Sequence, residues 1–237
     1  MSGVLVRSVV AVGVLCVALV GCSQEKKAEP VPLPRTTVSG AVDLETDKAA
    51  VAQAFAADRE ALLAKDGKAV AALLSADSIA YFAALKKLAL TASEPYLRRA
   101  RVSDQLAVLF LRLRVRPEDL RRWSPTEIVI DSVRHDQFSA GGNVRRMSTG
   151  AVEVSSDTAS VLMKLDGKES QFSFTFWRED GLWKFRMIPL LEAIESTMRA
   201  LVQERHLTDR TFVDQALAAE QPDPDKIATA WKPMGSQ

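Results

Sequence analysis

The two histidines, His135 and His206, are the first candidates for chemistry in this chain. His135 lies between Asp131 and Asp136, and a histidine beside a carboxylate can act as a general base. An ordinary surface side chain at the end of a strand is the alternative interpretation. His206 follows a charged helix end, where the helix dipole favours a cation. The zinc-protease, CxxC, nucleophile-elbow, P-loop and dinucleotide-binding motifs are absent, so we predict no metal site and no cofactor.

Cysteine chemistry is predicted near the start of the chain. Arg7 precedes an apolar run that ends in Leu19-Val20-Gly21-Cys22, and this run is shorter than the ~20 residues that span a bilayer. These four residues resemble the lipobox of bacterial lipoproteins, in which the leader is cleaved before the cysteine and lipid is attached to its thiol. The resemblance implies a signal peptide at residues 1–21, cleavage between Gly21 and Cys22, and lipidation of Cys22. An ordinary secretory peptide and an uncleaved anchor helix are the alternatives.

The segment after the cysteine predicts a tether and a location. Residues 22–42 include three alternating prolines, which favour an extended chain that could hold a domain roughly 50–60 Å from its anchor. In lipoprotein sorting, an aspartate after the cysteine often retains the protein at the inner membrane, and here Ser23 stands there. We therefore expect the cell envelope: the outer membrane if the cell has two membranes, and otherwise the outer face of the plasma membrane. The membrane, reached through the lipid on Cys22, is thus a predicted partner.

Charge is balanced overall but uneven along the chain. The sequence has 31 Lys+Arg and 30 Asp+Glu, so no global field attracts nucleic acid, and we predict no nucleic-acid partner. Arginines gather in residues 93–125, and acidic residues gather in 190–225. These two regions could pair with each other, the arginines could lie on solvated helix faces, or they could form a docking patch for an anionic polymer, lipid headgroups or an acidic protein. The predicted patch consists of eight arginines: Arg98, Arg99, Arg101, Arg112, Arg114, Arg116, Arg121 and Arg122.

Residues 43–123 show the apolar period of helices. Gly67 is expected to end the first helix, and Ser93 with Pro95 resembles the start of another. After Ser124-Pro125 the period changes to two, and we predict a strand over 126–133 followed by further strands to residue 188. This order predicts an α+β fold, with N-terminal helices packed on one face of a curved antiparallel sheet and helices at the C-terminal end.

Two Asp-Gly pairs, 166–167 and 180–181, predict tight hairpin turns because both turn residues need positive φ. They set a register in which Phe176 lies opposite Phe185, and Val161 lies opposite Phe172. Residues paired across strands share a face, so one face of the sheet should be apolar and the other polar. The predicted apolar face consists of Val161, Met163, Phe172, Phe174, Phe176, Trp183, Phe185 and Met187.

The chain after the sheet predicts two more helices and a tail. Leu191, Ile194, Met198 and Leu201 recur at helical spacing, and Thr208 or Asp209 can cap a second helix. We expect the last residues to be irregular, with Trp231 clasped onto the domain. The predicted domain boundaries are 43–206 for the α+β domain and 207–237 for the C-terminal helix and tail.

The ending EDGLWKFRM at 179–187, after helices and an antiparallel meander, resembles the nuclear transport factor 2-like superfamily. The resemblance covers about residues 46–190 and implies a sheet folded around a cone-shaped pocket that helices cap. An enzyme of that superfamily would need a carboxylate or histidine in the cone and a nearby oxyanion donor. Asp58, Tyr81 and His135 are the candidate set. The sequence departs from the pattern in having no strand between the first helices and a long extension after the sheet.

These observations leave three functions open. The first is non-enzymatic binding, either of a small apolar ligand in the cone or of an envelope protein at the surface. The second is an isomerase- or dehydratase-type enzyme that uses the carboxylate, histidine and tyrosine. The third is a scaffold that dimerises through its C-terminal helices. Fold alone does not choose among them, because function resides in the site.

Overall fold

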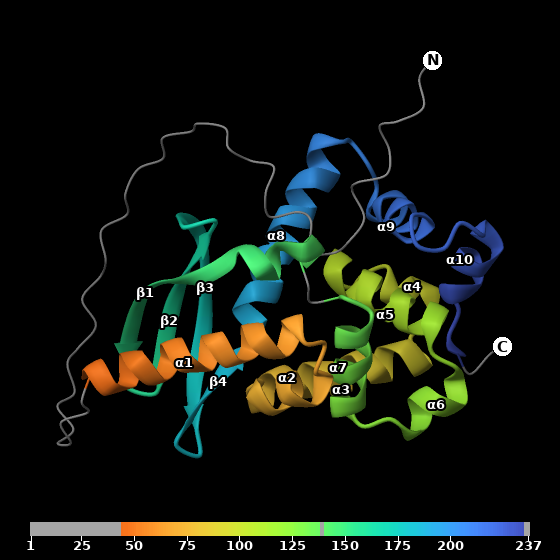
Figure 1. The fold of residues 1–237 in the computed structure, drawn as a ribbon. Coiled ribbons are helices and arrows are strands. Elements are labelled where there is room, and N and C mark those ends of the chain that lie inside the picture. The colour runs from red at the N-terminus through yellow and green to blue at the C-terminus, as the bar shows by residue number, and fades with distance from the viewer. Residues whose placement is uncertain (1–43, 138–139, 235–237) are drawn as a thin grey trace.

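The computed structural model describes residues 44–137 and 140–234, which form an α+β fold as predicted (Figure 1). A four-stranded antiparallel sheet forms one side of the molecule, and a cluster of helices forms the other. Helix α1 (Leu44–Leu63) lies across one face of the sheet and contacts β1, β2 and β4. The predicted signal peptide, Cys22 and the tether at 22–42 lie outside the described residues.

The helical prediction for the first part of the chain is confirmed. Lys65 has a φ of 55°, which ends α1, and the Asp66 side chain then accepts hydrogen bonds from the N–H groups of Lys68 and Ala69 to cap α2. The prediction that Gly67 ends the first helix is wrong, because α1 ends at Leu63 and Gly67 is the first residue of α2. A side chain does not fit there, since a Cβ would lie 2.6 Å from the Cα of Ile130. The remaining helices are α2 (Gly67–Leu73), α3 (Ala76–Thr91), α4 (Glu94–Leu97), α5 (Val102–Arg114) and α6 (Pro117–Arg122).

The predicted strand at 126–133 is wrong, because this segment is helix α7 (Pro125–Arg134). Ser124 and Glu127 form a complete capping box, and Pro125 occupies the first turn, where no N–H is needed. Helix α7 packs against α2 and α3. Its β-branched residues suggested a strand, but the capping residues and the tertiary packing decide the conformation.

The sheet follows the predicted meander in the order β1-β2-β3-β4. Both Asp-Gly turns have positive φ at each residue, with 50° and 77° at Asp166 and Gly167 and 51° and 77° at Asp180 and Gly181. This confirms the hairpin prediction. The strands are β1 (Met147–Ser155), β2 (Thr158–Leu165), β3 (Lys168–Glu179) and β4 (Leu182–Arg186), preceded by the 3₁₀ segment η2 (Ala140–Arg146).

The predicted register is right at one hairpin and wrong at the other. Phe176 pairs with Phe185 as expected, but Val161 pairs with Phe174 rather than Phe172, because the register shifts between Leu162 and Lys164. The shift is by two residues, an even number, so the described side chains on either side of it keep their predicted faces. A second irregularity interrupts β1 between Thr149 and Val152, and such bulges increase the bend of a strand.

The start of α3 is fastened to the edge strand β4. The N–H of Ser75 donates to the Phe185 carbonyl at 2.9 Å, and the Ser78 hydroxyl accepts from the N–H of Met187 at 2.8 Å. Arg186 also pairs with Asp77 at 2.7 Å. These contacts hold the helical cluster beside the sheet at a fixed angle.

The C-terminal part is more regular than predicted. Helices α8 (Ile188–Glu204) and α9 (Asp209–Ala218) confirm the expected pair, and Thr208 caps α9. The tail predicted as irregular contains α10 (Pro224–Ala230), capped by Asp223. Trp231 is fully buried, and its indole donates to Asp214 at 2.9 Å, so the predicted clasp is confirmed.

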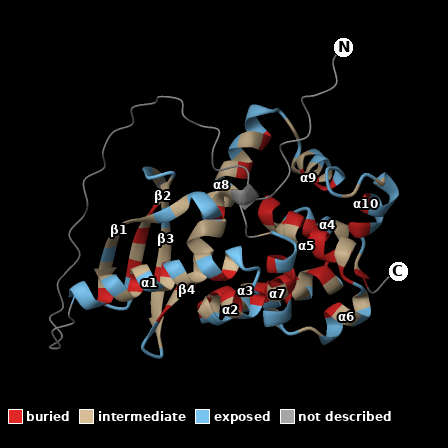
Figure 2. Ribbon diagram, viewed as in Figure 1, coloured by how far each residue is buried: buried red, intermediate tan, exposed pale blue. Residues whose placement is uncertain are grey.

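Arg112 joins three helices inside the molecule. Its guanidinium donates to five backbone carbonyls at 2.6–3.0 Å. Three of these carbonyls belong to the end of α3 and two to the end of α10, while Arg112 itself belongs to α5. Burial lowers the pKa of Arg112 to about 10, so the side chain remains cationic at neutral pH. Figure 2 shows that buried residues are concentrated in α5 and the helices around it.

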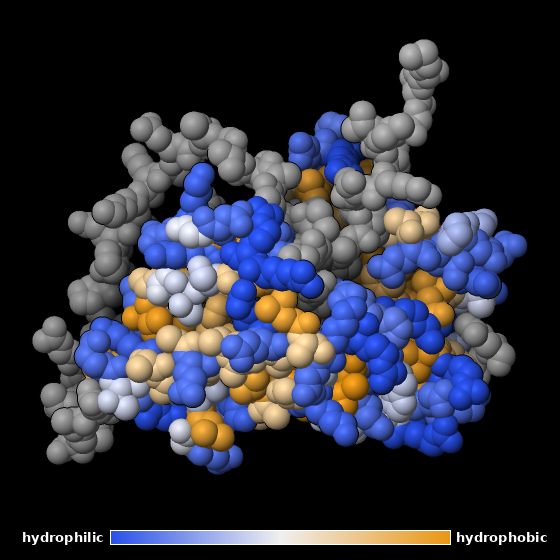
Figure 3. Space-filling view, in the orientation of Figure 1, coloured by the Kyte–Doolittle hydropathy of each residue, from blue (hydrophilic) through white to orange (hydrophobic). Residues whose placement is uncertain are grey.

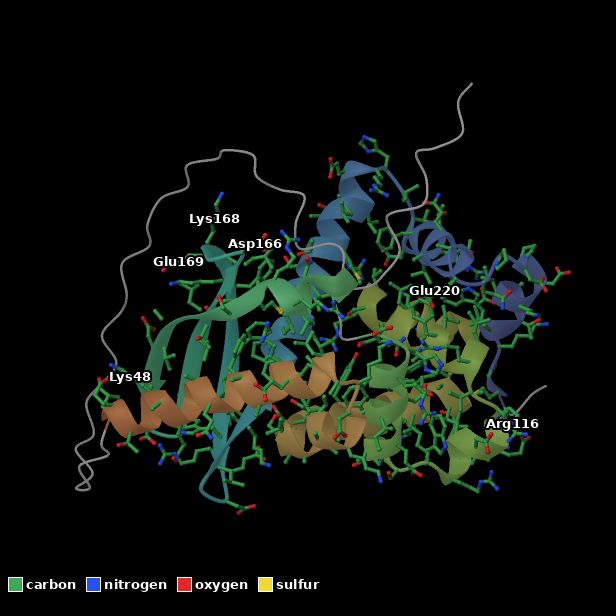
Figure 4. All side chains as sticks on the ribbon, in the orientation of Figure 1. Lys48, Arg116, Asp166, Lys168, Glu169 and Glu220 are labelled. Atoms are coloured by element: carbon green, nitrogen blue, oxygen red, sulfur yellow. The ribbon has the colours of Figure 1, made fainter. Side chains whose placement is uncertain are left out.

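Replacing Arg112 with methionine should destabilise the protein by about 3 kcal/mol or more, because five buried carbonyls lose their donors together. Arg116→Met is the matched control, since Arg116 is exposed at the far end of the helices (Figure 4) and should change stability by about 0.5 kcal/mol or less. Urea unfolding followed by circular dichroism gives both values. Equal stability of the two variants would contradict the role of Arg112.

Candidate functional site

A cavity of about 230 Å³ lies between the sheet and the helices. Its wall combines the inner face of the sheet with residues from α1, α2, α3, α5, α7 and α8. Most of the lining is apolar, as expected for a ligand pocket. The larger apolar lining residues are Phe55, Leu62, Leu74, Phe82, Leu85, Phe110, Leu111, Ile128, Met147, Met163, Leu165, Phe172, Phe174, Phe176, Phe185, Met187, Leu190, Leu191 and Ile194.

An aromatic chain runs along the sheet side of the cavity. The ring of Phe174 lies 5.4 Å from that of Phe55 on α1 and 5.4 Å from that of Phe185 on β4, and Phe176 lies 5.7 Å from Phe185. All of these pairs are tilted or edge-on, which is the favoured arrangement of aromatic rings. The predicted apolar face of the sheet therefore forms this wall, and α1 is joined to it through Phe55.

Asp58 points into this apolar space from α1. It follows Phe55 by three residues and precedes Leu62 by four, so all three side chains lie on the cavity face of the helix. Within the described part of the chain, its carboxylate has no hydrogen-bond or ion-pair partner. Burial alone raises the pKa of Asp58 to about 7, because no nearby cation or donor favours the charged form. The side chain is only half-buried because its exposed surface faces the cavity.

Tyr81 also lines the cavity, but its hydroxyl is already used. It donates to the Asp104 carboxylate at 2.8 Å, and Arg101 holds the same carboxylate at 2.8 and 3.1 Å. Burial raises the pKa of Tyr81, and the Asp104 charge raises it further. Tyr81 is therefore a fixed neutral phenol whose proton points at Asp104.

His135 is not part of the cavity wall. It lies at the end of α7, where its Nδ1 is 2.9 Å from the Asp131 carbonyl oxygen and 3.3 Å from the Asp131 carboxylate. Its side chain is 41% exposed. The structure thus brings Asp58 and Tyr81 to one cavity and leaves His135 outside it.

The predicted arginine patch does not form one surface. Arg112 is buried, and Arg114 is half-buried with its guanidinium 5.3 Å from the Phe110 ring. Most of the others pair with acids three or four residues away on their own segments, as Arg116 and Arg122 do with Asp119. An ion pair between Glu94 on α4 and Arg210 on α9 does link the arginine-rich region to the acidic one. In this pair, however, the acid comes from the arginine-rich region and the arginine comes from the acidic region. Arg101 is half-buried, and the exposed arginines of the predicted patch are Arg98, Arg99, Arg116, Arg121 and Arg122.

Several polar lining residues were not predicted: Arg59, Ser103, Ser132, Gln137 and Asn143. The capping box at Ser124 was a signal for α7, and a helix there would have placed Ser132 on the same face as Ile128. Arg59 lines the cavity, and its Nε and Nη2 donate to the carbonyls of Val144 and Arg145 at 3.0 Å each.

Comparisons with protein-family models, with characterised proteins and with solved structures found no significant match. The resemblance to the nuclear transport factor 2-like superfamily and the lipobox therefore remain predictions. Within residues 44–137 and 140–234, no helix is long and apolar enough to cross a membrane. The same residues contain no cluster of three or more side chains suited to holding a metal ion.

Asp58 should make stability depend on pH. Between about pH 4 and 7 the folded protein keeps the Asp58 proton while the unfolded chain has released it, so stability falls as pH rises through this window. Asp58→Asn removes this dependence and should be more stable than the wild type at pH 8, by roughly 2–4 kcal/mol. The gain should vanish near pH 4. Urea unfolding at several pH values measures it, and a gain that is constant with pH would contradict the raised pKa.

Proposed function

We propose that this chain is a lipid-anchored protein of the cell envelope that reversibly binds a small apolar molecule in the cavity between sheet and helices. The observation that carries the proposal is the cavity itself: about 230 Å³ of mainly apolar space. Packed domains contain few voids larger than a water molecule. An unfilled cavity of this size forgoes on the order of 5 kcal/mol of packing, which is comparable to the net stability of a domain.

The volume sets the size of the ligand. It is about one and a half times the roughly 150 Å³ cavity that accepts benzene. A single ring with a short side chain, or a short branched aliphatic compound, fits this space. A drug-sized molecule, for which pockets of about 300 Å³ or more are usual, exceeds it.

The enzymatic alternative has less support. The raised pKa of Asp58 suits an acid or base, which is the one observation in its favour. However, the Tyr81 proton is directed to Asp104, and His135 lies outside the cavity. The site therefore offers a carboxylate without a ready oxyanion donor from the predicted set.

The scaffold alternative also has less support. The C-terminal helices use their apolar faces within the chain, because Val213, Leu217 and Ile227 are buried and α9 and α10 both pack on α5. Figure 3 shows a surface that is mostly hydrophilic over the helical half, with hydrophobic residues exposed in small areas. Isolated apolar residues of this kind are normal on a monomer.

Filling the cavity should abolish ligand binding. Ala107 lines the cavity on α5, and Ala107→Phe places a ring in the space. Propylbenzene is a suitable probe, and saturable shifts of cavity methyl groups in NMR spectra report its binding. We expect binding by the wild type and none by Ala107→Phe.

The matched control is Ala56→Phe, because Ala56 is exposed on α1. This variant should bind propylbenzene like the wild type. The proposal fails if the wild type shows no saturable binding, or if both phenylalanine variants bind equally well. Thermal unfolding of each variant confirms that it is folded.

The lipid anchor has a separate test. Cys22→Ala removes the predicted acceptor thiol, so the protein expressed in a bacterial host should lose incorporation of labelled palmitate and move from the membrane to the soluble envelope fraction. Ser23→Ala is the control and should keep its lipid. Continued labelling of Cys22→Ala would show that the lipobox interpretation is wrong.

A further inference from the structure

We propose, resting on the function proposed above, that the cavity selects ligands that carry one protonated amine, with the ammonium group paired to Asp58 and the apolar body filling the remaining space. Asp58 is the single acidic side chain among the described residues that line the cavity. A carboxylate in apolar surroundings is stabilised only by a partner charge or by several hydrogen bonds. The described chain supplies neither, so a bound ligand can provide the partner charge.

The neighbouring cation does not neutralise Asp58. Arg59 is the adjacent residue on α1 and lines the same cavity, but its guanidinium binds the backbone carbonyls of Val144 and Arg145. This contact fixes η2 against α1 and uses two of the guanidinium nitrogens. Burial raises the pKa of Asp58, and no cation of the protein lowers it, in keeping with the contacts that Arg59 makes to the backbone.

The other groups around the cavity do not provide a competing charge. Tyr81 of α3 is neutral and donates to Asp104 of α5. The lining residues from the sheet, α7 and α8 carry no charged side chain. A ligand anion would therefore meet one carboxylate and a guanidinium whose Nε and Nη2 already donate to the backbone, whereas an ammonium would meet the single carboxylate that complements it.

The aromatic wall adds to this preference. Phe55 lies one helical turn before Asp58 on the same face of α1, and its ring packs against Phe174. A cation held near the Asp58 carboxylate lies in the neighbourhood of these rings, whose faces attract cations. The same rings give the hydrocarbon part of the ligand an apolar surface.

Amine binding should be coupled to proton release. An ammonium favours the charged form of Asp58 and so lowers the pKa of its carboxyl from about 7. Affinity for an amine should fall about tenfold per pH unit below that pKa, since the carboxyl must lose its proton before it can pair. A neutral hydrocarbon requires no such change.

Three probes of the same size and shape test the inference: 2-phenylethylamine, 2-phenylethanol and propylbenzene. At pH 8 the wild type should bind the amine about tenfold or more tightly than propylbenzene, and the preference should disappear near pH 5. Titration calorimetry in buffers of different ionisation enthalpy should show proton release for the amine near pH 7 and none for propylbenzene.

Asp58→Asn should lose the preference for the amine and still bind propylbenzene within about twofold of the wild type. Glu60→Gln is the matched control, because Glu60 is exposed on the same helix, and it should keep the preference. If the wild type binds propylbenzene but does not prefer the amine, this inference is overturned and the proposed function stands. If none of the probes binds, the proposed function falls and the inference falls with it.

Discussion

A buried guanidinium without a carboxylate partner is the interaction on which the helical half of the molecule depends. Moving a cation out of water is costly unless its donors are satisfied. Arg112 meets that requirement with carbonyls at the ends of α3 and α10, where the helix dipole is negative. Because Arg112 belongs to α5, its contacts hold three helices in one arrangement. Helices α3 and α5 also contribute Phe82, Leu85, Phe110 and Leu111 to the cavity, so a contact outside the site fixes part of its wall.

The sheet provides the opposite wall, and the edge strand β4 is one of the places where the helices are joined to it. Ser75 and Ser78 bind the backbone of β4 and the residue after it, so the position of α3 follows from the position of β4. Near the turn between β3 and β4, Asp47 of α1 pairs with Arg178 of β3, whose guanidinium lies 4.6 Å from the Trp183 ring. These contacts fix the helices relative to the sheet, so the cavity between them can persist despite its cost in packing.

The parts of the fold that the sequence predicts are those determined by neighbouring residues. Asp166-Gly167 and Asp180-Gly181 determine their turns locally, and the two-residue bulge at Leu162 leaves the apolar face unchanged because the side-chain period is two. The segment after Ser124 was missed because its β-branched residues outweighed a capping box that was equally local. The role of Arg112 could not be predicted, since nothing along the chain distinguishes it from the other arginines nearby.

The candidate site could be predicted in part. Asp58 could be identified because it interrupts an apolar stripe. His135 was wrongly grouped with it, because sequence proximity to carboxylates does not show where a side chain points.

Asp58 is a position at which the sequence departs from the apolar stripe of α1, and the departure lies in the candidate site. A leucine at this position would continue the stripe of Val51, Phe55 and Leu62 and would fill part of the cavity, to the benefit of stability. Departures of this kind are expected where a site must be kept. The chain places a cation at the next position, yet the donors of Arg59 go to the backbone of η2 and stabilise the wall. The carboxylate is thus left to interact with whatever molecule enters the cavity.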